Sequence, residues 1–370
     1  MSDARYIMIG GFLGAGKTTA MLRLARKLTA DGLRVGLITN DQSSGLVDTA
    51  LVRASGLPIE EITGGCFCCR FGSLLDAASN LTRDSAPEVF LAEPVGSCTD
   101  LRASVAYPLR RLYGDRFSVA PLSVLVDPVR SLRILGLESG KVFAPKVVYV
   151  YRKQLEEADV IVVNKSDMVD AGRLHRLEDA LAVEFPRADI FSVSALHSRG
   201  LDPWFQAILG GDLASFTAPD LDYEMYAEGE AMLGWYNATV RLTQSKPFSG
   251  NELLVRLASE IQSRLESAGA EIAHLKMTLT PEEDAGDIGV INLVRGDTSP
   301  FMAHFLAADL DSGELIVNLR AEGDPEQFQD IVNRALREVA AHEYALQLTV
   351  EHEERFRPAK PVPTYRMAEA

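Results

Sequence analysis

Gly11-Phe12-Leu13-Gly14-Ala15-Gly16-Lys17-Thr18 is the stretch on which the predicted fold depends, because it matches the phosphate-binding pattern G-x-x-x-x-G-K-[ST] in full. An apolar run, Tyr6-Ile7-Met8-Ile9, comes directly before it. After it, apolar residues recur at helical spacing at Met21, Leu24, Ala25 and Leu28. Strand, loop and helix therefore follow one another in the order that a nucleotide-binding loop requires.

The chemistry of this loop suits a nucleoside triphosphate. Its glycines permit a tight backbone turn that points N–H groups at phosphate oxygens, and the following helix adds the positive end of its dipole. Lys17 adds a positive charge, and the Thr18 hydroxyl is a ligand for Mg²⁺. The nucleotide-binding residues predicted here are Gly11, Gly14, Ala15, Gly16, Lys17, Thr18 and Thr19.

Length and composition indicate a globular protein of two domains. The 370 residues exceed the usual size of one domain, and the 47% hydrophobic and 24% charged content is typical of such proteins. A net charge of −15 argues against nonspecific binding to nucleic acid or to an anionic membrane. No apolar stretch approaches the roughly 20 residues of a membrane helix, and no basic leader precedes the first apolar run. We therefore expect a cytoplasmic protein that binds neither nucleic acid nor membrane.

Strand and helix patterns alternate through residues 1–212, which predicts an α/β domain with a doubly wound, mostly parallel sheet of the P-loop GTPase type. Beyond the strand before the phosphate loop, the expected strands are 33–39, 88–92, 122–126, 160–163 and 190–193. Ligands of such sheets gather at the carboxyl ends of the strands. Residues 213–234 form an acidic segment that we expect to be a linker.

Residues 235–355 are expected to form a smaller α+β domain with an antiparallel sheet, because strand-like runs lie between two helical segments. A capping box from Ser249 to Glu252 opens the first of these helices. Asp324 caps the second, with Pro325 at its first position. Residues 356–370 contain three prolines and are expected to be an extended tail.

Asn164-Lys165-Ser166-Asp167 follows the strand 160–163 and fits the guanine-reading signature N-K-x-D. The Asp167 carboxylate can accept hydrogen bonds from the ring N–H and exocyclic amine of guanine, whereas adenine presents an acceptor at the ring position. Lys165 can lie across the base with its apolar stem. Ser194 and Ala195 follow the next strand, where a backbone N–H would meet the guanine oxygen. The signature therefore predicts GTP rather than ATP, and it disfavours a kinase.

Two acids are candidates for the chemistry at the terminal phosphate. Glu93 ends an apolar strand, where phosphate-loop enzymes place an acid that contacts Mg²⁺ directly or through water. Asp41 lies in the polar loop after the second strand, where a nucleotide-sensing switch would sit. Lys17, Glu93 and Asp41 form the predicted catalytic group, and Thr18 and Glu93 are the predicted magnesium ligands. No arginine finger is recognisable, so we expect slow intrinsic hydrolysis of GTP to GDP and phosphate.

Three of the four cysteines fall in Gly64-Gly65-Cys66-Phe67-Cys68-Cys69. Thiolates at this spacing can converge on one soft metal ion such as zinc or copper(I). Two alternatives remain: a Cys66–Cys69 redox pair, which has C-x-x-C spacing, and three inert buried thiols. A fourth ligand is not recognisable, and the role of Cys98 is left open.

Together, the phosphate loop, the cysteine motif, Glu93-Pro94-Val95-Gly96 and Asn164–Asp167 resemble the CobW/HypB/UreG class of metal-centre GTPases. The G-G-C-x-C-C element is typical of its CobW-like branch. The resemblance covers about residues 5–210 and implies a metallochaperone or metal-insertion GTPase, with several members linked to zinc. It also implies Cys66, Cys68 and Cys69 as metal ligands.

The chain departs from the family pattern in three places. The loop that commonly reads N-E-F-G-E is Asn40-Asp41-Gln42-Ser43-Ser44 here, so one acid is shortened and the other is replaced by serine. The six histidines are scattered, whereas many relatives carry a His-rich tract. The C-terminal domain keeps only hints of the family pattern, such as Lys246-Pro247-Phe248 before a helix.

We therefore expect a GTP-hydrolysing metallochaperone that binds zinc, or another thiophilic transition metal, and delivers it to a client protein. Assembly into a homodimer is left open. Two alternatives remain: a redox-sensing regulatory GTPase that delivers no metal, and a cobalt- or cobalamin-related metal-insertion GTPase.

Overall fold

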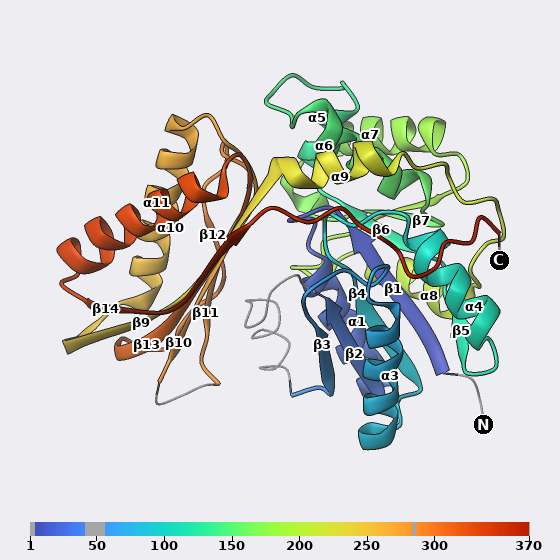
Figure 1. Cartoon of the computed structure of the whole chain (residues 1–370), viewed down its shortest axis with the longest axis horizontal. Coiled ribbons are helices and arrows are strands. Elements are labelled where there is room, and N and C mark those ends of the chain that lie inside the picture. The colour runs from blue at the N-terminus through green and yellow to red at the C-terminus, as the bar shows by residue number, and fades with distance from the viewer. Residues whose placement is uncertain (1–3, 41–55, 283–285, 370) are drawn as a thin grey trace. The chain divides into compact units, whose positions relative to one another are not determined.

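The chain folds into two compact units in a computed structural model that describes residues 4–40, 56–282 and 286–369 (Figure 1). Unit 1 comprises residues 4–40, 56–229 and 360–369 of this described chain. Unit 2 comprises residues 230–359. Unit 1 is therefore built from sequence on both sides of unit 2.

A parallel sheet forms the centre of unit 1, as the alternation of strand and helix patterns predicts. Its main path runs in the order β3-β2-β4-β1-β6-β7-β8, β5 pairs with β1, and every recorded pairing is parallel. The strands are β1 (Ala4–Gly11), β2 (Val35–Asn40), β3 (Ile59–Ile62), β4 (Val89–Glu93), β5 (Phe117–Val119), β6 (Ser123–Val126), β7 (Val160–Val163) and β8 (Asp189–Ser192). The α/β fold class with a mostly parallel sheet is confirmed.

Helices connect these strands, because parallel neighbours need crossover connections. They are α1 (Lys17–Ala30), α3 (Phe71–Ser85), α4 (Tyr107–Tyr113), α5 (Pro128–Ile134), α6 (Pro145–Glu156), α7 (Ala171–Glu184) and α8 (Leu201–Gly210). The apolar stripe of α1 is buried at Met21, Leu24, Ala25 and Leu28. A π-helical turn, Arg102–Ala106, leads into α4.

The carboxyl ends of the strands carry most of the predicted site residues. The phosphate loop follows β1, Asn40 ends β2 and Glu93 ends β4. Asp127 follows β6 and Asn164 follows β7. Because parallel strands present these ends at one edge of the sheet, the candidate chemistry is assembled there.

Unit 2 holds an antiparallel sheet in the order β12-β11-β10-β13-β9-β14. Its strands are β9 (Leu233–Phe248), β10 (Glu271–Pro281), β11 (Gly289–Leu293), β12 (Phe301–His304), β13 (Leu310–Glu322) and β14 (Gln347–Phe356). Its helices are α10 (Gly250–Ser267), α11 (Pro325–Ala335) and a π-helical segment, Leu336–Glu343. The separate antiparallel α+β unit that the C-terminal sequence predicts is confirmed.

Alternation along the strands explains how this sheet and its helices form one core. In β9, alternate residues from Tyr236 to Leu242 are buried together with Leu254 and Leu257 of α10 and Phe328 of α11. Both predicted caps form, because the side chains of Ser249 and Asp324 accept hydrogen bonds from the N–H groups of Glu252 and Glu326.

Two segments outside these sheets bear on the site. Helix α9 (Tyr223–Met232) occupies part of the segment expected to be a linker. Residues 357–369 have no helix or strand, and the main chain of Thr364 and Met367 is hydrogen-bonded within unit 1. Among the described helices, none has the length and apolar character needed to span a membrane.

Candidate nucleotide and metal site

The phosphate loop has the backbone that its glycines allow. Gly14 and Gly16 adopt positive φ angles of 75° and 91°, and a Cβ at Gly16 would lie 2.4 Å from Asn164 Nδ2. Three consecutive carbonyls accept hydrogen bonds: Leu13 O from Arg130 at 2.7 Å, Gly14 O from Lys165 Nζ at 2.6 Å and Ala15 O from Asn164 Nδ2 at 2.8 Å. The loop is therefore held in its turned form by neighbouring side chains before any ligand binds.

Lys17, Thr18 and Glu93 meet at the start of α1. The Thr18 hydroxyl donates to Glu93 Oε1 over 3.1 Å, and Lys17 Nζ lies 3.9 Å from the same oxygen. All three residues are buried. Hydroxyl and carboxylate oxygens are the donors that Mg²⁺ prefers, so Thr18 and Glu93 fit the ion that the sequence assigns to them.

The N-K-x-D segment is linked to the phosphate loop through its first two residues. Asn164 Oδ1 accepts from the N–H of Ala195 at 3.0 Å, while the Asn164 amide donates to the loop carbonyl described above. Lys165 has a φ of 57° and pairs with Asp127 at 3.1 Å. The Asn164 side chain therefore ties the loop after β7 to both the phosphate loop and the loop after β8.

The predicted base-reading acid lies beside these loops. The Asp167 carboxylate is 3.7 Å from Nε2 of His197, and the side chain of Asp167 is partly exposed. Ser194 and Ala195 are buried, whereas Thr19 on α1 is exposed. Asp41 lies outside the described residues.

The three clustered cysteines come together in one corner of unit 1, on the turn between β3 and α3. Their Sγ atoms are separated by 2.8 Å for Cys66–Cys68, 3.3 Å for Cys66–Cys69 and 3.7 Å for Cys68–Cys69. Cys66 and Cys68 are buried, and Cys69 is half-buried. The spacing that the sequence indicates for a metal therefore brings three sulfurs together.

Asn40 holds this turn from the end of β2. Its amide donates to the carbonyls of Ile62 at 3.0 Å and Gly65 at 2.8 Å, and its Oδ1 accepts from the N–H of Phe67 at 2.8 Å. The sequence alone did not predict this role of Asn40. Its only local signal is a polar residue at the carboxyl end of a buried strand.

Hydrogen bonding among the three sulfurs shifts the pKa values of the cysteines in opposite directions. Hydrogen bonding with Cys68 and Cys69 holds the pKa of Cys66 well below its ordinary value. The bond to Cys66 in turn raises the pKa of Cys68, and raises the pKa of Cys69 to about 11. Because zinc binds thiolates, metal binding at these sulfurs has to displace protons.

Cys98 is a fourth cysteine at the same place. It lies in the loop after β4, it is buried, and its thiol is hydrogen-bonded to that of Cys66. The sequence analysis left its role open. The one signal that could have placed it is its position five residues after Glu93, on a loop expected near the cysteine turn.

A C-terminal strap, defined here as residues 360–368, runs along the cysteine turn. The N–H of Val362 donates to Cys69 Sγ at 3.2 Å, and the N–H of Thr364 donates to the carbonyl of Cys68 at 2.8 Å. The Arg366 guanidinium is anchored by Asp100 at 3.0 Å. The strap therefore contacts both the cysteine turn and the loop that follows β4.

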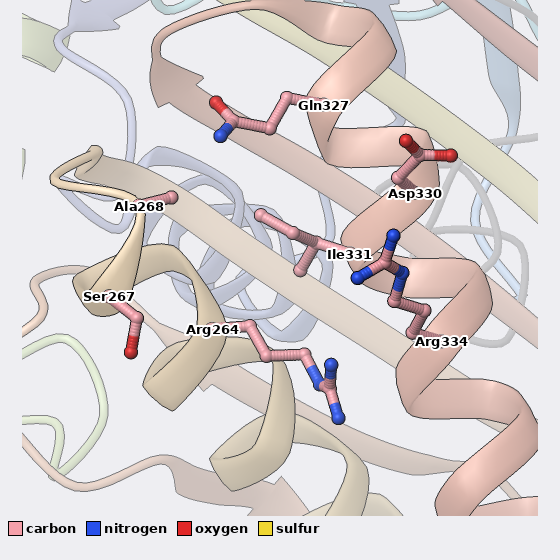
Figure 2. Close-up of a pocket in the computed structure, with 7 residues that line it drawn as sticks. All are labelled: Arg264, Ser267, Ala268, Gln327, Asp330, Ile331 and Arg334. Carbon is pink, nitrogen blue, oxygen red and sulfur yellow. The ribbon is translucent and has the colours of Figure 1, made fainter.

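A separate cavity of about 430 Å³ lies in unit 2 between the end of α10 and α11 (Figure 2). Its lining residues are Arg264, Ser267, Ala268, Gln327, Asp330, Ile331 and Arg334. Arg264 is already paired with Glu260 at 2.8 Å and with Glu338. We assign no ligand to this cavity.

Comparison with known proteins gives one family match. The model described as CobW/HypB/UreG, nucleotide-binding domain, matches residues 5–192. This match includes the phosphate loop, the cysteine turn, Glu93 and the N-K-x-D segment.

Curated relatives are similar over part of their length. The zinc chaperone CobW of Sinorhizobium sp is 29% identical over 195 residues, which cover 47% of this chain and 54% of the relative. The zinc chaperone YeiR of Escherichia coli strain K12 is 32% identical over 161 residues, covering 43% of this chain and 46% of the relative. The chain thus spans about half the length of the curated relatives it matches.

Solved structures show more distant likeness. HypB from Helicobacter pylori in complex with nickel is 18% identical with a TM-score of 0.42, covering 56% of this chain and 86% of its own. Zn(II)-bound YjiA GTPase from E. coli is 16% identical with a TM-score of 0.37, covering 92% of this chain and 99% of its own.

Proposed function

Because the chain belongs to the CobW/HypB/UreG family of nucleotide-binding proteins, we propose that it is a GTP-hydrolysing zinc chaperone that delivers zinc to a client protein. The observation that carries the proposal is the convergence of the Cys66, Cys68 and Cys69 sulfurs in the same unit as a complete phosphate loop. The similarity to two zinc chaperones supports zinc among the thiophilic metals.

The cysteine turn has the donor chemistry for this cargo. Zinc binds thiolate sulfur at about 2.3 Å, so sulfurs around one ion lie roughly 3.8 Å apart in tetrahedral geometry. The observed separations of 2.8 to 3.7 Å require only that the sulfurs move slightly apart. Each thiol that binds releases its proton to solvent.

The nucleotide site has the parts for triphosphate hydrolysis. Lys17 and the phosphate-loop N–H groups would bind the phosphates, and Asp167 would select guanine. Thr18 and Glu93 would hold Mg²⁺, which neutralises charge on the phosphates when bound. Water then attacks the terminal phosphorus and the bond to the bridging oxygen breaks, which gives GDP and inorganic phosphate.

Two variants separate the two halves of the proposal. Cys68→Ala is expected to lose zinc binding and to keep GTP binding, because Cys68 makes no recorded side-chain contact with the phosphate loop. Lys17→Ala is expected to lose GTP hydrolysis and to keep zinc binding. Zinc content is measured by elemental analysis of protein purified anaerobically, and hydrolysis is measured by phosphate release.

The affinities of the unmodified protein for GTP and ATP test the GTPase assignment. GTP should bind far more tightly than ATP, and Asp167→Asn should relax this preference by removing the acceptor carboxylate. Equal affinity for GTP and ATP would contradict the GTPase assignment. A metal-free protein that forms a Cys66–Cys69 disulfide reversibly would favour the redox-sensing alternative.

A further inference from the structure

The loop after β4 holds Cys98 in a fixed backbone position. Its N–H donates to the carbonyl of Val95 at 3.0 Å, and its carbonyl accepts from Gln154 Nε2 at 2.8 Å. The same Gln154 amide also donates to Gly96 O at 3.0 Å, and Gln154 is itself buried. The main chain at Cys98 is therefore anchored to Gln154 of α6.

The Cys98 thiol points to the cysteine turn. It is 1% exposed and hydrogen-bonded to Cys66, and its charge acts on Cys68 as well. A buried cysteine in an apolar pocket is ordinarily an inert packing residue. Here its neighbours are two sulfurs that we assign to the metal.

Zinc takes four ligands in proteins, and the cysteine turn supplies three. Cys98 is the remaining cysteine among the described residues, and its sulfur is hydrogen-bonded to Cys66 while lying outside the group of three sulfurs that are all within 4.8 Å of one another. We propose that Cys98 is the fourth zinc ligand, so that the loop after β4 and the cysteine turn bind one ion between them. This inference rests on the zinc-binding part of the proposed function.

A ligand from this loop would give the site two states. The loop begins at Glu93, which contacts Thr18 and Lys17 of the phosphate loop. With Cys98 bound, zinc has four thiolates and no open position, as in structural zinc sites. When Cys98 leaves the ion and takes back a proton, three thiolates and one open position remain for a donor atom of a client.

Cobalt(II) and zinc titrations of the full chain test this assignment. The wild-type cobalt complex should show tetrahedral d–d bands and a thiolate charge-transfer band of four-sulfur intensity, because that band grows with each bound thiolate. Cys98→Ser should reduce the charge-transfer intensity by about a quarter and lower zinc affinity by at least about 10-fold. Proton release on zinc binding should fall by about one.

Ser104→Ala is the matched control, since Ser104 is equally buried a few residues further along and its hydroxyl bonds only to the carbonyl of Asp100 in the recorded contacts. This control should bind zinc as the wild type does. Zinc-edge X-ray absorption of the wild-type protein counts sulfurs without any variant, so an unfolded Cys98 variant does not leave the assignment undecided.

The outcomes separate the inference from the proposed function. Four sulfurs in the wild type and three in Cys98→Ser support Cys98 as a ligand. Three sulfurs plus a nitrogen or oxygen in the wild type, unchanged in Cys98→Ser, overturn this inference and leave the zinc chaperone proposal standing. No metal binding by the wild type overturns both.

Discussion

Asn40 shows how one side chain can hold the cysteine turn in place through its backbone. Its amide and its carbonyl oxygen make three hydrogen bonds to the backbone, two to residues just before the cysteine turn and one to Phe67 within it. Asn40 is buried, so these backbone groups have no ready replacement in water. The turn that carries the sulfurs is thus tied to the end of β2.

Asn40→Ala should loosen the cysteine turn. The N–H of Phe67 and the carbonyls of Ile62 and Gly65 would lose their partner, which should lower the free energy of unfolding of unit 1 by about 1–3 kcal/mol. The thiols should react faster with a colorimetric thiol reagent under native conditions.

Asn251→Ala is the control for this change. Asn251 makes a similar pair of bonds in unit 2, to the carbonyl of Leu306 at 3.0 Å and from its N–H at 2.9 Å. It should cost comparable stability without altering thiol reactivity. Equal thiol reaction rates in the two variants would show that Asn40 does not position the turn.

Glu157 predicts a pH dependence of stability. Burial raises its pKa to about 8, although Thr99 and the N–H of Arg102 donate to its carboxylate at 3.0 and 2.9 Å. Below the ordinary carboxyl pKa, the Glu157 carboxyl is protonated in both the folded and the unfolded state. Its contribution to the free energy of unfolding is then fully present. As pH rises toward 8 the unfolded state loses this proton first, so the free energy of unfolding should fall by up to about 1.4 kcal/mol per pH unit.

Glu157→Gln should remove this contribution. Its amide can accept from the N–H of Arg102 and donate to Thr99, and it does not titrate. Melting temperatures measured between pH 5 and 8 should therefore fall less steeply in the variant than in the wild type. Parallel pH profiles would mean that Glu157 is ionised in the folded protein at neutral pH.

At the scale of elements, the strap contacts the cysteine turn, α3 and the loop after β4. It contributes an N–H to Cys69 Sγ, and Tyr365 packs its ring edge-on against Phe71 with centroids 5.2 Å apart. Beyond the anchor at Asp100, Met367 donates its N–H to the carbonyl of Ala103. The segment is irregular in conformation but specific in its contacts.

A chain ending at Lys360 should leave Cys69 more reactive. The truncation removes the hydrogen bond to Cys69 Sγ, and such a bond contributes about 1.4 kcal/mol. Its loss should increase the rate of alkylation at Cys69 on the order of 10-fold. Val362→Pro removes the backbone N–H that donates to Cys69 Sγ. This variant should show part of the increase in the alkylation rate. Mass spectrometry of alkylated peptides reports the rate at each cysteine.

Arg357→Ala serves as the control for the strap, because Arg357 bonds to the carbonyl of Ala231 within unit 2. Its cysteines should react as those of the wild type do. An unchanged rate at Cys69 in the truncated chain would show that the strap does not protect the sulfur.

The sequence predicted the elements that are formed by residues close together in the chain, and it did not predict those that depend on distant residues. The phosphate loop and the caps at Ser249 and Asp324 depend on residues a few positions apart, so their patterns predicted them. Strand β3 reads Ile59-Glu60-Glu61-Ile62 and is paired through its backbone with β2, so its side chains gave no strand pattern. The strap has no periodicity, because its partners lie in a distant part of the chain.

The same limit applies to the site. The sequence predicted the three sulfurs of the cysteine turn, because C-x-C-C places them within one turn of backbone. It did not predict that Cys98 would contact Cys66 or that Asn40 would hold the backbone of the turn, because Cys98 lies in the loop after β4 and Asn40 ends β2. The specific nucleotide and metal roles of these residues stay predictions until they are measured.

At the scale of the whole molecule, a continuous series of contacts in unit 1 connects the two candidate sites. Thr18 contacts Glu93, the loop that begins at Glu93 carries Cys98, and Cys98 contacts Cys66. If this series of contacts couples the two sites, thermodynamic linkage requires that zinc and GTP alter each other's affinity by one common factor, typically about 5- to 150-fold.

Zinc affinity should therefore differ between protein bound to GDP and protein bound to a non-hydrolysable GTP analogue. Competition with a chromophoric chelator in the presence of Mg²⁺ measures the zinc affinity in each state, and a parallel titration measures the GTP affinity with and without zinc. Cys68→Ala should abolish the effect on GTP affinity while leaving GTP binding intact. Identical zinc affinities in the two nucleotide states would rule out nucleotide-driven transfer.

The sequence of unit 2 lies between two parts of the sequence of unit 1, so these two parts are synthesised at different times. Residues 360–368 are synthesised only after all of unit 2, whereas the cysteine turn is made well before it. At about 5–20 residues per second, translation of the intervening residues 70–359 takes about 15–60 seconds. During that interval the nascent chain presents Cys69 without the strap, so a thiol reagent or a metal ion can reach this sulfur before the N–H of Val362 contacts it.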